Sequence, residues 1–162
     1  MKIDVMKKMI EYFQSDVVRI NHALKVLDFA IIMASDENID KISEEIIVYA
    51  AILHDVGILE AERKYGSAMG KYQEIEGPFI AREILTALNI HDEIVDRVCY
   101  IIGNHHSYTK IDGVDFQIVV EADFLVNMFE DDLKKEAIEN IRENIFKTGS
   151  GLRLVNTMYL SN

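Results

Sequence analysis

The sequence has little of several residue types, and each shortage narrows what the protein can be. It contains one cysteine, Cys99, so no internal disulfide can form, and a reducing cytoplasm fits that usage. No apolar run reaches the roughly 18 residues that suggest a membrane span. The first residues mix charge into every turn and lack the apolar core of a signal peptide. We therefore expect a cytoplasmic protein without a membrane partner.

Basic residues are also scarce. The chain has 17 lysines and arginines against 28 aspartates and glutamates, a formal net charge of −11. Proteins that bind polynucleotides usually present a basic stripe, so this balance argues against such a partner. A small phosphorylated ligand remains compatible, because a bound metal and a few local cations can override the global field inside one pocket.

Helices dominate the expected structure. With one proline and eight glycines in 162 residues, long helices are permitted almost everywhere, and no strand-like alternation is sustained. The length suits one domain with a sizeable core. We predict a single all-α domain over residues 1–162, with a core at about 16–130 and C-terminal helices at 131–160 packed on it. The predicted helices are 5–13, 16–34, 44–56, 78–89, about 94–102, 114–130 and one from 131, although 114–120 also fits a strand.

Local signals set the boundaries of these helices. Ser43 is a candidate N-cap, and Gly57 is a natural helix stop. Pro78 fits the first turn of the next helix. Residues 57–75 form the only long stretch predicted as irregular, and a loop of that length is often functional. Further breaks are expected at Asp112-Gly113, at Asp131-Asp132 and at Gly149-Ser150-Gly151.

Imidazole and carboxylate side chains recur beside the apolar helices. His22 comes first, His54-Asp55 ends the apolar run Ile-Val-Tyr-Ala-Ala-Ile-Leu, His105-His106 follows another apolar helix, and Asp123 lies within Glu-Ala-Asp-Phe-Leu. First-row metals take such ligands from proteins. Unpaired charges are costly beside apolar surfaces. These residues are therefore candidate metal ligands.

Each residue also has a purely structural interpretation. A single histidine on an apolar face, such as His22, is more often part of the core than a ligand. His91-Asp92 repeats the dipeptide of His54-Asp55, but it starts a helix, where Asp92 meets the positive end of the helix dipole. Asp123 is harder to explain structurally, because its neighbours are apolar, and Asn127 one turn later could orient it. The joint occurrence of these residues favours a metal site.

The order His22, then His54-Asp55 in Ala-Ile-Leu-His-Asp-Val-Gly-Ile, then Asp123 resembles the HD-domain superfamily of metal-dependent phosphohydrolases. The likeness spans about residues 16–130, and Glu-Gly-Pro-Phe-Ile-Ala-Arg-Glu-Ile-Leu at 76–85 is similar to the family's helix between the dipeptide and the later histidines. The resemblance implies an all-α fold in which His22, His54, Asp55 and Asp123 converge on a divalent metal. Mn, Fe, Co, Ni, Zn and Mg are the candidate ions.

Some members of the superfamily hold a second metal through further histidines. His105-His106 matches the paired-histidine position, but the remaining histidine is absent, and Glu74 and Glu76 stand at about its place. The resemblance thus implies one metal and allows a second, held by His105, His106 and Glu76. Alternatively, His106 would contact a substrate phosphate or protonate a leaving group.

The expected reaction is in-line attack of an acidified water on a phosphomonoester, which the metal and nearby cations would stabilise. Asp55 would hold the metal and orient the water, and Glu60 or Glu62 could serve as general acid or base. Among the cations, Arg19 lies one helical turn before His22 and is the first candidate for a phosphate contact. The further candidates, each also interpretable as a solvated surface cation, are Lys64, Lys71 and Arg82.

Two other functions compete with a phosphohydrolase whose substrate is a nucleotide or similar small molecule. One is a non-catalytic sensor that binds a metal or nucleotide. The other is a di-iron oxygenase on the same fold, which would require both metals. Leu154, Val155, Met158 and Tyr159 near the C-terminus either close the core or form the face of a homodimer.

Overall fold

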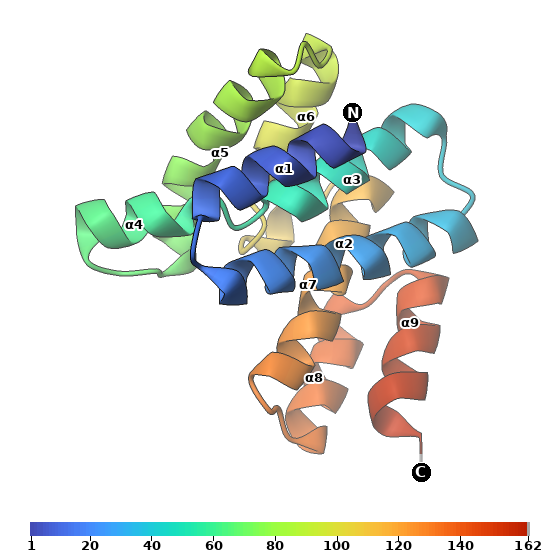
Figure 1. Cartoon of the computed structure of the whole chain (residues 1–162). Coiled ribbons are helices and arrows are strands. Elements are labelled where there is room, and N and C mark those ends of the chain that lie inside the picture. The colour runs from blue at the N-terminus through green and yellow to red at the C-terminus, as the bar shows by residue number, and fades with distance from the viewer. Residues whose placement is uncertain (162) are drawn as a thin grey trace.

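Helices account for all the regular structure that the computed structural model describes, residues 1–161, and this range contains no β-strand. The all-α prediction is confirmed, including residues 114–120, which are helical. Figure 1 shows the arrangement. The α-helices are α1 (Lys2–Phe13), α2 (Val17–Asp36), α3 (Lys41–Leu53), α4 (Ile58–Tyr65), α5 (Gly70–Ala87), α6 (Asp92–Ile102), α7 (Val114–Glu130), α8 (Lys135–Ile145) and α9 (Gly149–Val155), with short helical turns at Tyr108–Lys110 and Asn156–Leu160.

Helix α3 lies at the centre of the fold. It packs against α1, α2, α6 and α7, and all residues from Ile46 to Leu53 are buried. Helices α4, α5 and α6 lie on one side of this centre, and α8 and α9 lie on the other (Figure 1). The apolar run that precedes His54-Asp55 is thus buried on all sides, which fixes the C-terminal end of α3 within the core.

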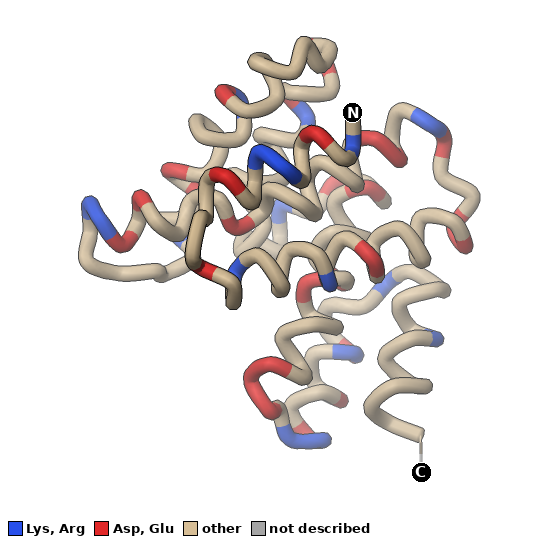
Figure 2. The backbone as a smooth tube through the Cα atoms, in the orientation of Figure 1, with Lys and Arg blue, Asp and Glu red and all other residues tan. Residues whose placement is uncertain are grey.

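Charged residues occur on most helices, including the central ones (Figure 2). Figure 2 shows acidic positions distributed over most of the molecule, as the net charge leads one to expect. Within residues 1–161, none of the helices combines the length and the apolar character needed to cross a bilayer.

Helix α3 starts earlier than predicted and stops earlier. Asp40, rather than Ser43, is the N-cap: its carboxylate accepts hydrogen bonds from the backbone N–H groups of Ile42 (3.0 Å) and Ser43 (3.1 Å). At the other end, His54 is the C-cap, and residues 54–57 form a turn. His54 keeps helical dihedral angles at this turn (φ −55°, ψ −37°), and both side chains reach the same space, with Asp55 Oδ2 3.4 Å from His54 Nε2.

The region 57–75, predicted to be irregular, is largely helical. It contains α4, which Gly66 ends in the left-handed conformation (φ 63°), and the first turns of α5. Gly57 explains the close packing here, because a Cβ on it would lie 2.5 Å from the carbonyl oxygen of Gln73 and 2.7 Å from the backbone nitrogen of Gly77. Pro78 was expected to open a helix but lies inside α5. Packing of the first turns of α5 on the turn at Gly57 outweighs the one backbone hydrogen bond that proline removes.

The C-terminal helices are held to α7. Helix α8 begins at Lys135 rather than at Asp131, because Asp132 adopts a left-handed conformation (φ 49°) that interrupts the helix. The predicted break at the glycines falls before them, and Gly149 opens α9. Val155 is buried, and the Tyr159 hydroxyl donates to the carbonyl oxygen of Leu125 (2.6 Å), so these two residues pack on the core, whereas Met158 is 41% exposed.

Candidate metal centre

Four predicted ligands come together from three helices. His22 lies on α2, His54 and Asp55 lie at the end of α3, and Asp123 lies on α7. His22 Nε2 is 3.2 Å from His54 Nε2 and 3.1 Å from Asp123 Oδ1. Asp55 Oδ2 is 3.5 Å from His22 Nε2 and 3.4 Å from His54 Nε2, and 3.6 Å separates His54 Nε2 from Asp123 Oδ1. The fold therefore gathers these donor atoms, which are far apart in the sequence, into one small volume.

The spacing of the four donor atoms suits a common ion. Nitrogen and oxygen ligands lie about 2.0–2.1 Å from a metal such as zinc, and in a tetrahedral set they are about 3.3–3.4 Å apart. The five distances above range from 3.1 to 3.6 Å. The group of His22, His54 and Asp123 could hold a metal ion by this measure, and Asp55 reaches the same two imidazoles.

Contacts on the far side of each imidazole leave a lone pair facing the centre. His54 Nδ1 lies 2.9 Å from the carbonyl oxygen of Ala51, to which it can only donate. His22 Nδ1 lies 2.7 Å from a carboxylate oxygen of Glu130, which likewise accepts. With the proton on Nδ1, the Nε2 atoms are free to bind a cation, and such partners are typical of histidines that bind metals.

The charges of the cluster reinforce this arrangement. Burial opposes ionisation of Asp123, but the adjacent imidazoles of His22 and His54 hold the pKa of the carboxyl well below the ordinary value. Burial likewise opposes ionisation of Asp55, yet the neighbouring imidazoles of His54 and His105 hold the pKa of its carboxyl well below the ordinary value. The pKa of His54 is raised by the same carboxylates against the effect of burial. The site thus stabilises positive charge at its centre, which a divalent cation would supply.

A second group adjoins the first through Asp55. Donor atoms of Asp55, His105 and His106 lie within 4.8 Å of one another. Asp55 Oδ1 is 3.7 Å from His105 Nε2, a buried atom without a hydrogen-bond partner within residues 1–161. His105 Nδ1 lies 2.7 Å from the carbonyl oxygen of Ile102 and donates to it. A carboxylate oxygen and an imidazole lone pair therefore face each other, and both would bind a cation or a hydrogen-bond donor.

His106 is a neutral side chain at physiological pH. Burial and the neighbouring His105 lower the pKa of its imidazole to about 4. Such a ring carries one proton and one lone pair, which suits a ligand or a hydrogen-bonding group. The same low pKa speaks against the alternative in which His106 protonates a leaving group.

Glu76 is not part of the second group, contrary to our expectation. Its carboxylate accepts hydrogen bonds from Lys64 Nζ (2.5 Å) and from the Tyr65 hydroxyl (2.9 Å) on α4. Lys64, a predicted phosphate contact, is thereby paired as well. Glu60, a predicted acid or base, is bound by Arg63 Nη2 at 2.7 Å. These side chains belong to a network of ion pairs between α4 and α5.

The three remaining predicted cations also have partners within the chain. Arg19 is one turn before His22 and pairs with Asp16 and with Glu62, both at 2.6 Å, so it joins α2 to α4. Lys71 lies over the ring of Tyr72, 4.7 Å from its centroid. Arg82, the third of these cations, pairs with Asp96 at 2.7 Å.

Two contributors were not predicted from the sequence. Glu130, which accepts a hydrogen bond from His22, stands seven residues after Asp123. Residues seven apart lie on the same face of a helix, and this spacing could have predicted that Glu130 lies near the centre. Gln73 contacts His106, Oε1 to Nε2 at 3.3 Å, and no local pattern marks it. Asn127, which was predicted to orient Asp123, donates to Asp123 Oδ1 at 2.9 Å.

Comparisons with known proteins agree with this geometry. A family model described as HD domain matches residues 19–147. Among solved structures, the crystal structure of a predicted HD superfamily hydrolase from an uncultured Thermotogales bacterium superposes with a TM-score of 0.69. It shares 22% sequence identity, and the match covers 96% of this chain and 83% of that one. A search of curated proteins gave no significant match.

Proposed function

The chain belongs to the HD-domain family, and we propose that it is a metal-dependent phosphohydrolase that cleaves a small phosphomonoester, with a nucleotide as the first candidate. The observation that carries the proposal is the set of donor atoms of His22, His54, Asp55 and Asp123. Five distances between them lie in the range 3.1–3.6 Å. Two carboxylates and two imidazole lone pairs facing one another need a cation. A hydrolytic centre is the use that the family makes of such a cation.

The ligands divide the work between them. His22, His54 and Asp123 would hold the ion, and Asp55 would hold it through Oδ2 while Oδ1 faces His105. When bound, a divalent cation supplies Lewis acidity, which acidifies water and withdraws electron density from phosphoryl oxygens. Asp55 Oδ1 would accept a hydrogen bond from the attacking water and orient it.

The proposed reaction forms one bond and breaks one. The water oxygen forms a bond to phosphorus, and the bond between phosphorus and the ester oxygen breaks. The attacking water gives one proton to solvent and its other proton stays with the inorganic phosphate, while the departing alkoxide takes one proton from solvent to become an alcohol. The group of Asp55, His105 and His106 lies beside the attacking water in this scheme and would hold a second cation or bind the phosphate.

A small substrate with an aromatic part fits the surroundings of the centre. Tyr108 follows the two histidines, and Phe124 follows Asp123; their ring centroids are 5.4 Å apart. Tyr108 is 39% exposed, so one side of this pair can be reached from solvent. The pair offers an apolar surface on which a nucleobase would stack, while Arg19 would approach the phosphate if it released Asp16 or Glu62.

The test compares two histidines that precede an aspartate. Protein purified without an affinity metal should contain a stoichiometric transition metal and hydrolyse phosphomonoesters such as nucleoside monophosphates. His54→Ala should lose that metal, and hydrolysis should fall by more than about 100-fold. His91→Ala is the matched control, because His91-Asp92 repeats the dipeptide at the start of α6, and it should keep both.

Other outcomes would identify the competing functions. Metal binding without hydrolysis of any phosphomonoester would favour a sensor, and Asp55→Ala would then change binding alone. Oxygen consumption with ferrous iron and two irons per chain would favour an oxygenase. No metal after incubation with manganese or iron would contradict the proposal as a whole.

A further inference from the structure

Gln73 reaches the second group from the first turn of α5. The side chain is 6% exposed, and its amide is held at both ends. Gln73 Nε2 donates to the carbonyl oxygen of Ala68 at 2.7 Å, and Gln73 Oε1 lies 3.3 Å from His106 Nε2. Because an amide nitrogen cannot accept and a carbonyl cannot donate, the contact with Ala68 determines which end of the amide faces His106.

His106 must therefore be the donor in its contact with Gln73. The amide oxygen accepts only, so Nε2 carries a proton, and whenever the ring is neutral its lone pair lies on Nδ1. His105 has the opposite arrangement, because its Nδ1 donates to Ile102 and its Nε2 is the lone pair. Two adjacent imidazoles thus expose different nitrogens.

The position of the His106 ring is fixed by close packing as well as by its hydrogen bond to Gln73. A Cβ on Gly70 would lie 2.6 Å from His106 Cγ, so the backbone of α5 is packed directly against the ring. Glu74 accepts hydrogen bonds from the backbone N–H of His106 (3.0 Å) and from the Ser107 hydroxyl (3.2 Å). The start of α5 fixes both the position of His106 and the nitrogen that carries its proton.

We propose that Gln73 is a positioning residue that holds the proton of His106 on Nε2, so that Nδ1 is the atom His106 contributes with His105 Nε2 and Asp55 Oδ1 to a second cation site. The proposal rests on the proposed function for the role of that cation. Glu76, the residue we first expected to complete the second site, is held away from it by Lys64 and Tyr65. In its place we assign Gln73, one turn earlier on α5, which acts through His106 rather than as a ligand.

Nuclear magnetic resonance tests the proton position directly. Two-bond proton–nitrogen spectra of the metal-free chain labelled with nitrogen-15 histidine distinguish the two ring nitrogens, and five histidines keep the spectrum simple. His106 should carry its proton on Nε2 and His105 on Nδ1. A proton on Nδ1 of His106 would overturn the proposal.

Variants of Gln73 then test its role. Gln73→Leu removes the acceptor, so the Nε2 proton of His106 should exchange with water at least about tenfold faster. Gln73→Glu keeps an acceptor for His106 but loses the donor to Ala68, so exchange should be slower than in Gln73→Leu. Gln117→Leu is the matched control, since Gln117 is also buried and anchored to a carbonyl, that of Ile145 at 2.7 Å. Unchanged exchange in Gln73→Leu, or equal acceleration in Gln117→Leu, would refute the assignment.

Zinc titration supplies the metal readout. The wild-type chain should bind two equivalents, and Gln73→Leu should weaken the second by about 10- to 100-fold while leaving the first unchanged. Binding of one equivalent by the wild type, or equal weakening of both, would overturn the proposed second site. The proton position and the zinc stoichiometry do not depend on hydrolysis, so inactivity towards phosphomonoesters would reject the proposed function alone.

Discussion

Two acidic residues two positions apart on α7 meet opposite environments. Glu121 is completely buried, and Asp123 is 16% exposed in side-chain terms. Glu121 Oε1 accepts from Gln117 Nε2 (2.6 Å) and from the backbone N–H groups of Lys147 (2.6 Å) and Thr148 (3.0 Å). Its other oxygen accepts from the Thr148 hydroxyl. The chain itself thus supplies the hydrogen bonds that a buried carboxylate needs.

The surroundings of Asp123 are less complete. Asn127 donates to Asp123 Oδ1. The other near atoms are the Nε2 atoms of His22 and His54, whose ring protons lie on Nδ1, facing Glu130 and the carbonyl oxygen of Ala51. His105 Nε2 has no partner within residues 1–161. The comparison teaches that burial alone does not mark a functional carboxylate. A structural acid has enough donors in its own chain, whereas a ligand faces other acceptors.

The largest effect is expected from removing the structural acid. Glu121→Ala leaves the backbone N–H groups of Lys147 and Thr148 without their acceptor, which should lower the free energy of unfolding by about 3–5 kcal/mol. Urea denaturation measures the loss, which should be the same with and without metal. Glu136→Ala, at an exposed position of α8, should change stability by less than about 0.5 kcal/mol. A loss of less than about 1 kcal/mol in Glu121→Ala would show that Glu121 is not the structural acid that the comparison requires.

The ligand acid should instead determine how stability responds to metal. A metal at 100 times its dissociation constant stabilises the folded state by about 2.7 kcal/mol. Asp123→Asn should abolish this increment, because the neutral amide replaces a charged ligand. Glu121→Gln, which keeps the acceptor oxygen for the backbone groups, should retain it. Thermal unfolding with and without metal decides the matter, and an increment in Asp123→Asn equal to that of the wild type would remove Asp123 from the ligands.

The sequence predicted which residues gather at the candidate metal centre better than it predicted the residues that support them. His22, His54, Asp55 and Asp123 could be chosen because their types and order matter, and the order depends on the chain alone. Glu76 was chosen from its position near a missing histidine, but its carboxylate is satisfied by Lys64 and Tyr65, a contact between two helices that no local pattern reveals.

Errors in the fold have the same origin. The helical periodicity of α2, α3 and α7 comes from burial along one element, so it was visible in the sequence. The region 57–75 was predicted as irregular because Gly66 and Gly70 are local breakers. Its helices depend on the fit of Gly57 against α5, which only the folded chain shows.

A glycine can sharpen the structural half of the comparison. A Cβ on Gly151 would lie 1.9 Å from Glu121 Oε2 and 2.8 Å from Thr148 Oγ1, so the carboxylate is enclosed by the first turn of α9. Gly151→Ala should therefore cost about 1–3 kcal/mol through overpacking. Gly149→Ala is the control, since its Cβ would first meet the flexible end of Arg153 at 3.4 Å, and a helical alanine should be neutral or slightly stabilising. Equal chemical denaturation midpoints for the two variants would contradict this fit.

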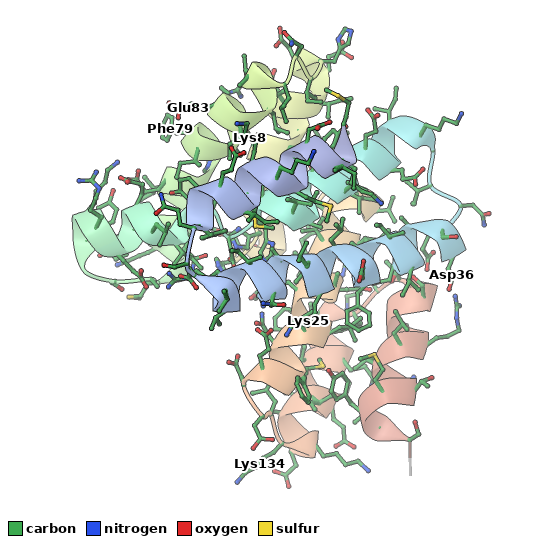
Figure 3. The ribbon with its side chains drawn as sticks, viewed as in Figure 1. Lys8, Lys25, Asp36, Phe79, Glu83 and Lys134 are labelled. Atoms are coloured by element: carbon green, nitrogen blue, oxygen red, sulfur yellow. The ribbon has the colours of Figure 1, made fainter. Side chains whose placement is uncertain are left out.

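The smallest effects concern the outer contacts of the metal centre. Glu130 Oε2 accepts from His22 Nδ1 at 2.7 Å, and its other oxygen pairs with Lys25, which Figure 3 shows extending from α2 towards α7. Glu130→Gln should weaken metal binding by about 10- to 100-fold, because the amide holds the His22 proton on Nδ1 less firmly. Lys25→Met should change the affinity by only a few-fold, since this lysine is 46% exposed and its ion pair is screened by solvent. Calorimetric titration of both variants with metal separates the contribution of the Glu130–His22 hydrogen bond from that of the Glu130–Lys25 ion pair. Equal losses of affinity would mean that Glu130 acts through its ion pair with Lys25 rather than through His22. The contrast with Glu121 would then rest only on the hydrogen-bond donors that surround each acid, and the hydrogen bond of Glu130 to the His22 imidazole would have no role in metal binding.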